Sequence, residues 1–256
     1  MARRRIRPIA HDDQLTVVDH LDELRSRIFV SLIAFGVAFA LCGWQNHLIL
    51  DIVNRPLPGD REPLTFGVTE PFTTTFTNAA YAAILLSLPV ILYQMYAFVL
   101  PAFSPAERKT ALPLLLLVPV LFIGGVLFCY FVVLPAGIEV LLDFNADEFD
   151  TELRAREYYS FATLVMLAMG LGFQIPVGTL IATRLGFVSP EQLRKSRRYA
   201  IVAIAVLASL LPTIDPVTLL LEMVPLILLY ELSIQLARLF GEPAGDVAEP
   251  VASEGS

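Results

Sequence analysis

The chain has 256 residues, of which 56% are hydrophobic, and it carries a net charge of −7. Its mean hydropathy is +0.67, and its apolar share exceeds the roughly 45–50% that is usual in soluble domains. The composition therefore excludes an ordinary soluble domain, and the acidic balance argues against a nucleic-acid partner because phosphate binding needs a basic surface.

The N-terminal segment is basic and precedes any membrane span. Residues 1–15 contain four arginines, but no long apolar run begins before residue 28. A cleavable signal peptide would place its apolar core sooner, so we expect a retained, flexible tail. Thr16-Val-Val-Asp19 then resembles a capping box and predicts a short amphipathic helix. The polar face of that helix contains His20, Glu23, Arg25 and Arg27.

Six apolar segments follow and predict a single all-α membrane domain over residues 16–239, with a disordered acidic tail at 240–256. Runs of about 18 or more apolar residues are typical of transmembrane helices. The fifth segment is shorter, and with the sixth it predicts a short hairpin in which Asp215 caps a helix that starts at Pro216. The predicted spans are 28–44, 76–99, 111–134, 158–182, 199–211 and 217–237.

The basic residues predict the orientation of these spans. With both termini cytoplasmic, 14 of the 18 Lys and Arg residues fall on the inner side. Inner loops of membrane proteins carry such an excess, so this topology is expected. Prolines within the spans, among them Pro89 and Pro176, remove backbone bonds and bend helices. We therefore expect a curved, concave bundle.

Polar residues inside spans are candidates for function. Gln174 lies deep, where either packing or a transport role fits. Glu222 lies about one turn inside the outer end of the last span, where we expect its carboxylate to reach water. Glu231 precedes Arg238 by seven residues on one helix face, so a structural pair or snorkelling is as reasonable as function.

No enzyme, metal or cofactor motif is found in the sequence. The chain has neither HExxH nor GxSxG, and its two cysteines, Cys42 and Cys129, form no ligand spacing. We expect a non-enzymatic protein without a cofactor. Both cysteines lie in apolar spans, where two packed thiols are favoured over a disulfide.

Two inner loops carry a helix-capping pattern. Ser104-Pro-Ala-Glu107 and Ser189-Pro-Glu-Gln192 both place an acid or amide three residues after a serine. Glu107 could therefore serve only its own helix, by bonding back to the backbone of Ser104. It also sits beside Arg108 and near aromatic residues, where a carboxylate could receive a cationic ligand.

A series of motifs in order resembles the TatC family, the receptor subunits of the twin-arginine protein translocase, over residues 16–239. The motifs are His20-Leu-Asp-Glu-Leu-Arg-Ser-Arg27, Pro56-Leu57, Glu70-Pro-Phe72, Pro89-Val-Ile-Leu-Tyr-Gln94, Ala97-Phe98, Pro101-Ala102, Glu107-Arg108, Tyr130-Phe-Val-Val133, Phe173-Gln-Ile-Pro176, Ser189-Pro190, Leu193-Arg194, Arg198-Tyr199, Asp215 and Tyr230-Glu231.

The resemblance implies a glove-like bundle of six helices that binds twin-arginine signal peptides of folded cargo at its cytoplasmic face. It also implies TatA/TatB-type single-span partners, a homo-oligomer within a hetero-complex, and transport driven by the proton-motive force. In the family the acid matching Glu107 is the main contact for the paired arginines, and the acid matching Glu23 lies close by. The implied signal-peptide site comprises Glu107, Glu23, Phe98, Gln94, Arg108, Leu100, Pro101, His20 and Arg25.

The resemblance also implies polar membrane positions at Gln174, Asp215 and Glu231, and structural prolines at Pro56, Pro89 and Pro176. Glu222 is a further polar membrane position, but it matches no acid of the family. Many relatives have Glu at the place of Gln174, so we hypothesise that Glu222 supplies the missing intramembrane charge. The alternative function is a secondary transporter for a small solute, which would need paired broken helices and buried ionisable residues.

Overall fold

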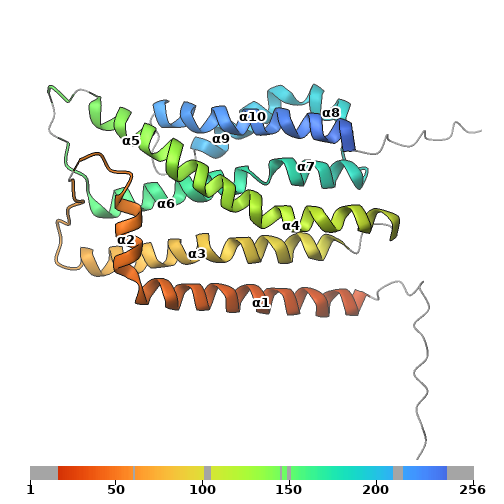
Figure 1. Ribbon diagram of the computed structural model, residues 1–256, viewed down its shortest axis with the longest axis horizontal. Coiled ribbons are helices and arrows are strands. Elements are labelled where there is room, and N and C mark those ends of the chain that lie inside the picture. Colours follow the sequence, from red (N-terminus) through yellow and green to blue (C-terminus); the bar gives the residue numbers. More distant parts are fainter. Residues whose placement is uncertain are drawn as a thin grey trace, which may run out of the picture.

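The computed structural model describes residues 17–59, 61–100, 105–144, 146–148, 151–209 and 216–240. Within these ranges the chain is helical, and the only strand-like feature is a β-bridge between Leu64 and Arg154. The all-α prediction is confirmed. The elements are α1 (Val17–Trp44), α2 (Asn46–Asn54), α3 (Glu70–Val99), α4 (Pro105–Phe128), the π-helix η2 (Cys129–Val133), α5 (Leu134–Asp143), α6 (Ala155–Gly172), α7 (Ile175–Arg184), α8 (Pro190–Lys195), α9 (Arg197–Ser209) and α10 (Pro216–Phe240) (Figure 1).

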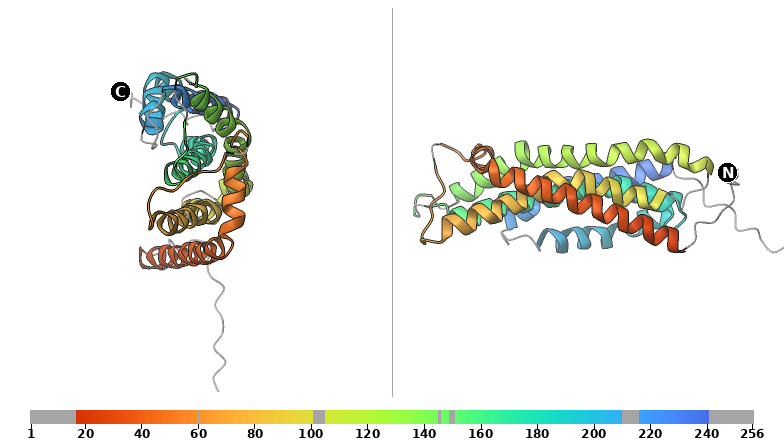
Figure 2. Two further views of the ribbon diagram at one scale, coloured as in Figure 1. Left: turned by 90° about the vertical axis from the view of Figure 1, so that its left-hand side faces the viewer. Right: turned by 90° about the horizontal axis from the view of Figure 1, so that it is seen from below.

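The long helices run side by side along one axis. The first residues of α1 and the last residues of α10 lie at the same end of the bundle. We call this the termini end; α2 crosses the opposite end, which we call the α2 end (Figure 1). Viewed along the axis, the helices follow a curve with α1 and α3 at one extremity and α8 and α9 at the other (Figure 2). This curvature matches the concave bundle expected from the sequence.

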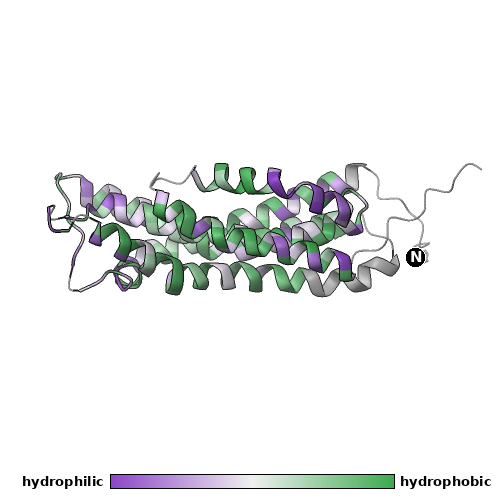
Figure 3. Cartoon of the chain, turned by 90° about the horizontal axis from the view of Figure 1, so that it is seen from above, coloured by the Kyte–Doolittle hydropathy of each residue, from purple (hydrophilic) through white to green (hydrophobic). Residues whose placement is uncertain are grey.

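Within the described ranges, five helical stretches are long and apolar enough to cross a membrane. Apolar residues dominate the middle of the bundle, and hydrophilic residues gather toward its two ends (Figure 3). With 13 residues, α9 is shorter than these five, and it packs against α10 as the predicted hairpin. The five stretches are His20–Trp44, Glu70–Val99, Leu115–Asp143, Ala155–Arg184 and Pro216–Leu239.

The first span differs from its prediction. We expected a short amphipathic helix followed by a separate span from residue 28, but α1 is one helix of 28 residues. Neither Gly nor Pro occurs between residues 17 and 35, so nothing in the sequence ends the first helix before the apolar run starts. The polar face of its first turns is therefore held rigidly on the end of a membrane span.

Small residues bring α1 close to α3 toward the α2 end. Ala38 and Cys42 of α1 pack against Ala79 and Ala83 of α3, and all four are buried. Side chains of this size let membrane helices approach closely. At the termini end, polar residues of α1 face the last turns of α3. Cys42 is a free thiol, as is Cys129 in a different cluster, as predicted.

Candidate functional site

A polar cluster joins α1 to the last turns of α3 at the termini end. His20, Glu23 and Arg27 recur at spacings of three and four residues, which places them on one face of α1. Gln94 and Phe98 share a face of α3 for the same reason. The structure brings these two faces together, so four predicted site residues (His20, Glu23, Gln94 and Phe98) and Arg27 form one site.

The guanidinium of Arg27 is the centre of this cluster. Its Nε donates to Glu23 Oε1 at 3.0 Å, and its Nη2 donates to the same oxygen at 2.5 Å. Its Nη1 donates to Gln94 Oε1 at 2.9 Å, and Nη2 also reaches the Ala97 carbonyl at 3.3 Å. The sequence had indicated Arg27 only as a residue on the polar face of the first helix; the tertiary structure makes it a link between α1 and α3.

His20 forms a second link across the same interface. Its ring stacks on Phe98 with centroids 4.2 Å apart and planes 14° from parallel. Its Nδ1 lies 3.8 Å from Glu23 Oε2, which places the imidazole beside the Glu23 carboxylate. Arg25 points elsewhere on α1, exposed and with its guanidinium carbon 5.7 Å from the Phe29 ring centre.

Several predicted site residues fall wholly or partly outside the described residues. Glu107 and Arg108 belong to the first turn of α4, but their side chains lie outside the described part of the chain, as do Pro101 and Asp215. The capping patterns at Thr16 and Ser104 fall there too. Leu100 directly follows α3 and is half-buried.

The third capping pattern is confirmed in full. The Ser189 hydroxyl accepts from the Gln192 amide N–H at 3.2 Å, and the Ser189 N–H donates to Gln192 Oε1 at 2.8 Å. This reciprocal pair starts α8 at Pro190. α10 likewise begins at Pro216, as the Asp-Pro pattern predicted.

Gln174 lies where the fourth span is interrupted. Phe173 ends α6, Gln174 precedes α7, and Pro176 occupies the first turn of α7. The Gln174 side chain is buried, and its Nε2 donates to the Val118 carbonyl of α4 at 3.2 Å. Its amide therefore ties α4 to the α6–α7 junction, which is the packing role weighed from the sequence.

Glu222 is buried inside the bundle. Its exposed fraction is 3%, and it borders a cavity of about 310 Å³ with otherwise apolar walls from α6, α7, α9 and α10. The expectation that its carboxylate reaches water is wrong, because residues of α6 and α9, among them Met169 and Ile204, enclose this side of α10. Among the described residues that line the cavity, Glu222 is the one titratable group.

Known proteins share both the sequence and the fold of this chain. A family model for the Sec-independent protein translocase protein TatC matches residues 19–225. The Sec-independent protein translocase protein TatC of Desulforapulum autotrophicum is 34% identical over 249 residues, covering 96% of this chain and 92% of that protein. The chloroplastic TATC protein of Arabidopsis thaliana is 36% identical over 222 residues, covering 86% of this chain and 65% of that protein.

A solved structure agrees with these relatives. The crystal structure of a twin arginine translocase receptor, TatC, matches with a TM-score of 0.77 and 33% identity, over 86% of this chain and 98% of that one. The chain belongs to the TatC family. It is therefore a multi-pass membrane component of a protein translocase, and the solute-transporter alternative is not favoured.

Glu231 of this TatC-family chain pairs with another helix. A pair with Arg238 on its own helix was one of the alternatives left open by the sequence, but Glu231 Oε2 accepts from Arg197 Nη2 of α9 at 2.7 Å. Seven residues span nearly two turns, about 10 Å along the axis, which is a long reach for two side chains. The short α9 instead brings Arg197 directly beside α10.

A further ion pair at the α2 end was not predicted. Glu70, the first residue of α3, accepts from Arg154 Nε at 2.7 Å and from the backbone N–H groups of Phe66 and Gly67 at 2.9 and 3.2 Å. The hydrogen bond from Arg154 to Glu70 raises the pKa of the Arg154 guanidinium. The pair joins the start of α3 to the start of α6, which are 84 residues apart, so no local pattern could reveal it.

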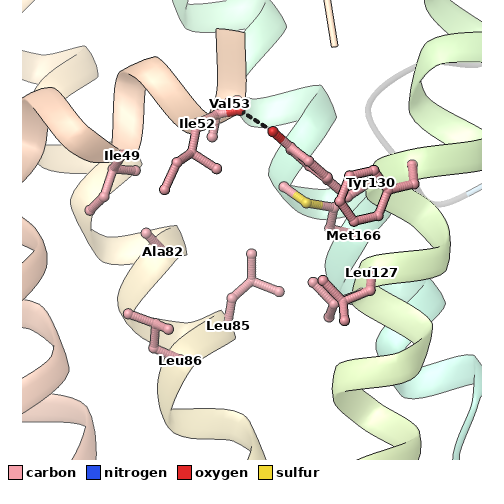
Figure 4. A pocket seen from close by; sticks show the side chains of 11 residues that line it. Ile49, Ile52, Val53, Ala82, Leu85, Leu86, Leu127, Tyr130 and Met166 are labelled. Atoms are coloured by element: carbon pink, nitrogen blue, oxygen red, sulfur yellow. Dashed lines mark hydrogen bonds between the residues drawn. The ribbon is translucent and has the colours of Figure 1, made fainter. Parts of the chain in front are cut away.

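Two tyrosines hold α2 against the rest of this TatC fold. Tyr130 of η2 donates its hydroxyl to the Ile52 carbonyl at 2.7 Å, and Tyr158 of α6 donates to the Val53 carbonyl at 2.6 Å. Figure 4 shows the first of these beside an apolar groove of about 300 Å³ between α2, α3 and η2. Pro56 follows Arg55, the last cap of α2, in keeping with its predicted structural role.

Proposed function

We propose that this chain is the signal-peptide receptor and core subunit of a twin-arginine translocase, which exports folded proteins under the proton-motive force without enzymatic chemistry of its own. The observation that carries the proposal is the convergence of Glu23, Gln94, His20 and Phe98 at the termini end. Seven residues after Leu100 the chain reaches Glu107 in the first turn of α4. Glu107 is the proposed second carboxylate of the site.

The chemistry of this site suits a pair of arginines. A guanidinium can fork onto a carboxylate with two parallel hydrogen bonds, and such charge-assisted bonds are roughly twice as strong as neutral ones. Lysine presents a single ammonium and cannot reproduce that geometry. Two acids, Glu107 and Glu23, can serve two arginines, while Arg25 and Arg108 repel every cationic peptide alike, so that binding requires the forked bonds.

The placement of the site supports a cytoplasmic entry. The proposed topology has six spans, with the short α9 as the fifth, and both termini in the cytoplasm of a cell whose cytoplasmic membrane holds the protein. The excess of Lys and Arg on that side is the basis for this orientation. Single-span TatA/TatB-type subunits and further copies of this chain are the proposed partners within the membrane.

Binding of a signal peptide to the purified protein tests the receptor proposal. A twin-arginine peptide should bind at least about tenfold more tightly than its Lys-Lys counterpart, because a charge-assisted hydrogen bond is worth roughly 1.5–3 kcal/mol and 1.4 kcal/mol is tenfold. Glu107→Gln should lose this preference while the helical content is retained. Equal affinities of the wild-type protein for both peptides would contradict the receptor proposal.

Glu222 is the proposed intramembrane acid, in place of the uncharged Gln174. Its burial beside a cavity between α6, α9 and α10 supports a role inside the bilayer, where ionisable residues are costly and commonly functional. Glu222→Gln should stop export of a twin-arginine cargo in cells while peptide binding is retained. Glu231→Gln is the control, because Glu231 lies on the same helix and is partly exposed. Unchanged export in Glu222→Gln would contradict the proposed role of Glu222.

A further inference from the structure

Arg27 occupies the position that an arginine of the ligand would need. Its guanidinium satisfies Glu23 with two donors, and its other bonds go to Gln94 and to the Ala97 carbonyl of α3. Arg27 and Glu23 are only partly exposed, at 23% and 28% of their side-chain surfaces. The acid proposed to bind an incoming guanidinium is therefore already engaged by one from its own helix.

The engagement uses only one carboxylate oxygen. Both donors of Arg27 meet Glu23 Oε1, whereas Oε2 lies 3.8 Å from His20 Nδ1, beyond the usual length of a hydrogen bond. A second guanidinium can reach Oε2 with a single bond, but the two-bond fork requires both oxygens. The full contact therefore needs Arg27 to move off Oε1.

We propose that Arg27 is a resident competitor, which occupies Glu23 in the empty receptor and yields it to one arginine of the signal peptide. This inference rests on the proposed receptor function. Arg27 thereby sets the specificity of this acid, because an incoming arginine can replace the bonds that Arg27 gives up. A lysine ammonium cannot replace both hydrogen bonds that Arg27 gives to Glu23, so it fails to displace the Arg27 guanidinium.

The acceptors on α3 make the exchange feasible. When Arg27 leaves Glu23, Gln94 Oε1 and the Ala97 carbonyl remain available to its Nη1 and Nη2. The Ala97 carbonyl lies in the last turn of α3, where backbone carbonyls lack partners within the helix. The displaced guanidinium consequently keeps two neutral hydrogen-bond acceptors, which offset part of the cost of separating its charge from Glu23 in the partly buried interface.

The test compares four peptides that carry Arg-Arg, Arg-Lys, Lys-Arg or Lys-Lys, bound to the purified full-length chain in lipid nanodiscs. In Arg27→Gln, Glu23 has no competitor, so the Lys-Lys affinity should rise by about tenfold and the Arg-Arg affinity by less. The gain in affinity for lysine should occur at only one of the two peptide positions, namely the position that contacts Glu23. Arg27→Lys keeps the positive charge but loses the two-donor geometry of the guanidinium. It should therefore also reduce the preference for arginine over lysine at that position.

Arg25→Gln is the matched control, since it removes the same charge two residues away on the exposed face of α1. It should change all four affinities by one common factor, as expected of a purely electrostatic effect. If Arg27→Gln weakens all four peptides and keeps their ratios, Arg27 merely positions Glu23 and the proposal is overturned.

The test also gives a result if the Arg27→Gln variant is unstable. If Arg27→Gln fails to fold, Arg27→Lys decides, and wild-type ratios in that variant overturn the proposal. Failure of the receptor function itself is recognised separately, because the wild-type protein would then bind Arg-Arg and Lys-Lys peptides equally.

Discussion

Replacing Tyr158 with Phe removes one hydroxyl and should measurably destabilise the α2 end of the protein. The hydroxyl is buried and donates to the Val53 carbonyl at 2.6 Å. That carbonyl belongs to the last turn of α2, where no intrahelical donor exists. The substitution thus leaves a buried carbonyl without its tyrosine partner, which costs about 1–3 kcal/mol.

Thermal unfolding of the purified protein in detergent measures this loss. Each kcal/mol corresponds to a midpoint shift of roughly 2–4 °C for a chain of this size. Tyr130→Phe is the matched control, because its hydroxyl donates to the neighbouring Ile52 carbonyl at an exposed site. There water can replace the lost donor, so the cost should stay at or below about 1 kcal/mol.

The comparison of the two thermal-midpoint shifts tests whether burial sets the cost of losing the tyrosine hydroxyl. A smaller shift for Tyr158→Phe than for Tyr130→Phe would refute the argument that burial of the orphan carbonyl sets the cost. Signal-peptide affinity should be unchanged in both variants, because α2 crosses the end of the bundle opposite to Glu23 (Figure 1).

Two further predictions concern helix packing and an ion pair. Gly125→Ala should destabilise the protein by about 1–3 kcal/mol, because an added Cβ would lie 2.9 Å from the Met169 carbonyl oxygen and 2.8 Å from the Phe173 ring. Gly124→Ala, with open space around the added atom, should leave the thermal midpoint unchanged or raise it. A double-mutant cycle with Arg197→Gln and Glu231→Gln should give a coupling below about 1 kcal/mol, since the pair is partly exposed. Coupling of Glu231 to Arg238 instead would contradict the observed pairing.

Sequence patterns predicted the helices of this protein well because those patterns are local. The apolar runs located every long helix, and the Ser189–Gln192 box and Pro216 marked helix starts. The ends of α1 and α3 were less accurate, since both helices extend well beyond the apolar residues at their N-terminal ends. The helices continue there because no residue in the sequence breaks them. A hydropathy profile detects apolar runs and does not show where helix-breaking residues are absent.

Partners between helices were predicted less well, for a physical reason. For Glu231 the sequence offered only Arg238 on its own helix as a possible partner, yet α9 supplies Arg197 from 34 residues away. Glu222 was expected at the surface because its distance from the helix end is visible in the sequence, whereas the cover provided by α6 and α9 is not. Which side of a helix is covered depends on neighbours that only the folded chain brings together.

The sequence by itself determined that this chain is a helical membrane protein, and its motifs determined the resemblance to the TatC family. That resemblance grouped Glu23, Gln94, His20 and Phe98 as candidates for one site. Only the tertiary structure decided what these residues do to one another. The packing of α1 beside α3 places Arg27 against Glu23 and Gln94, and contacts across 67 residues of chain depend on that packing rather than on any local pattern.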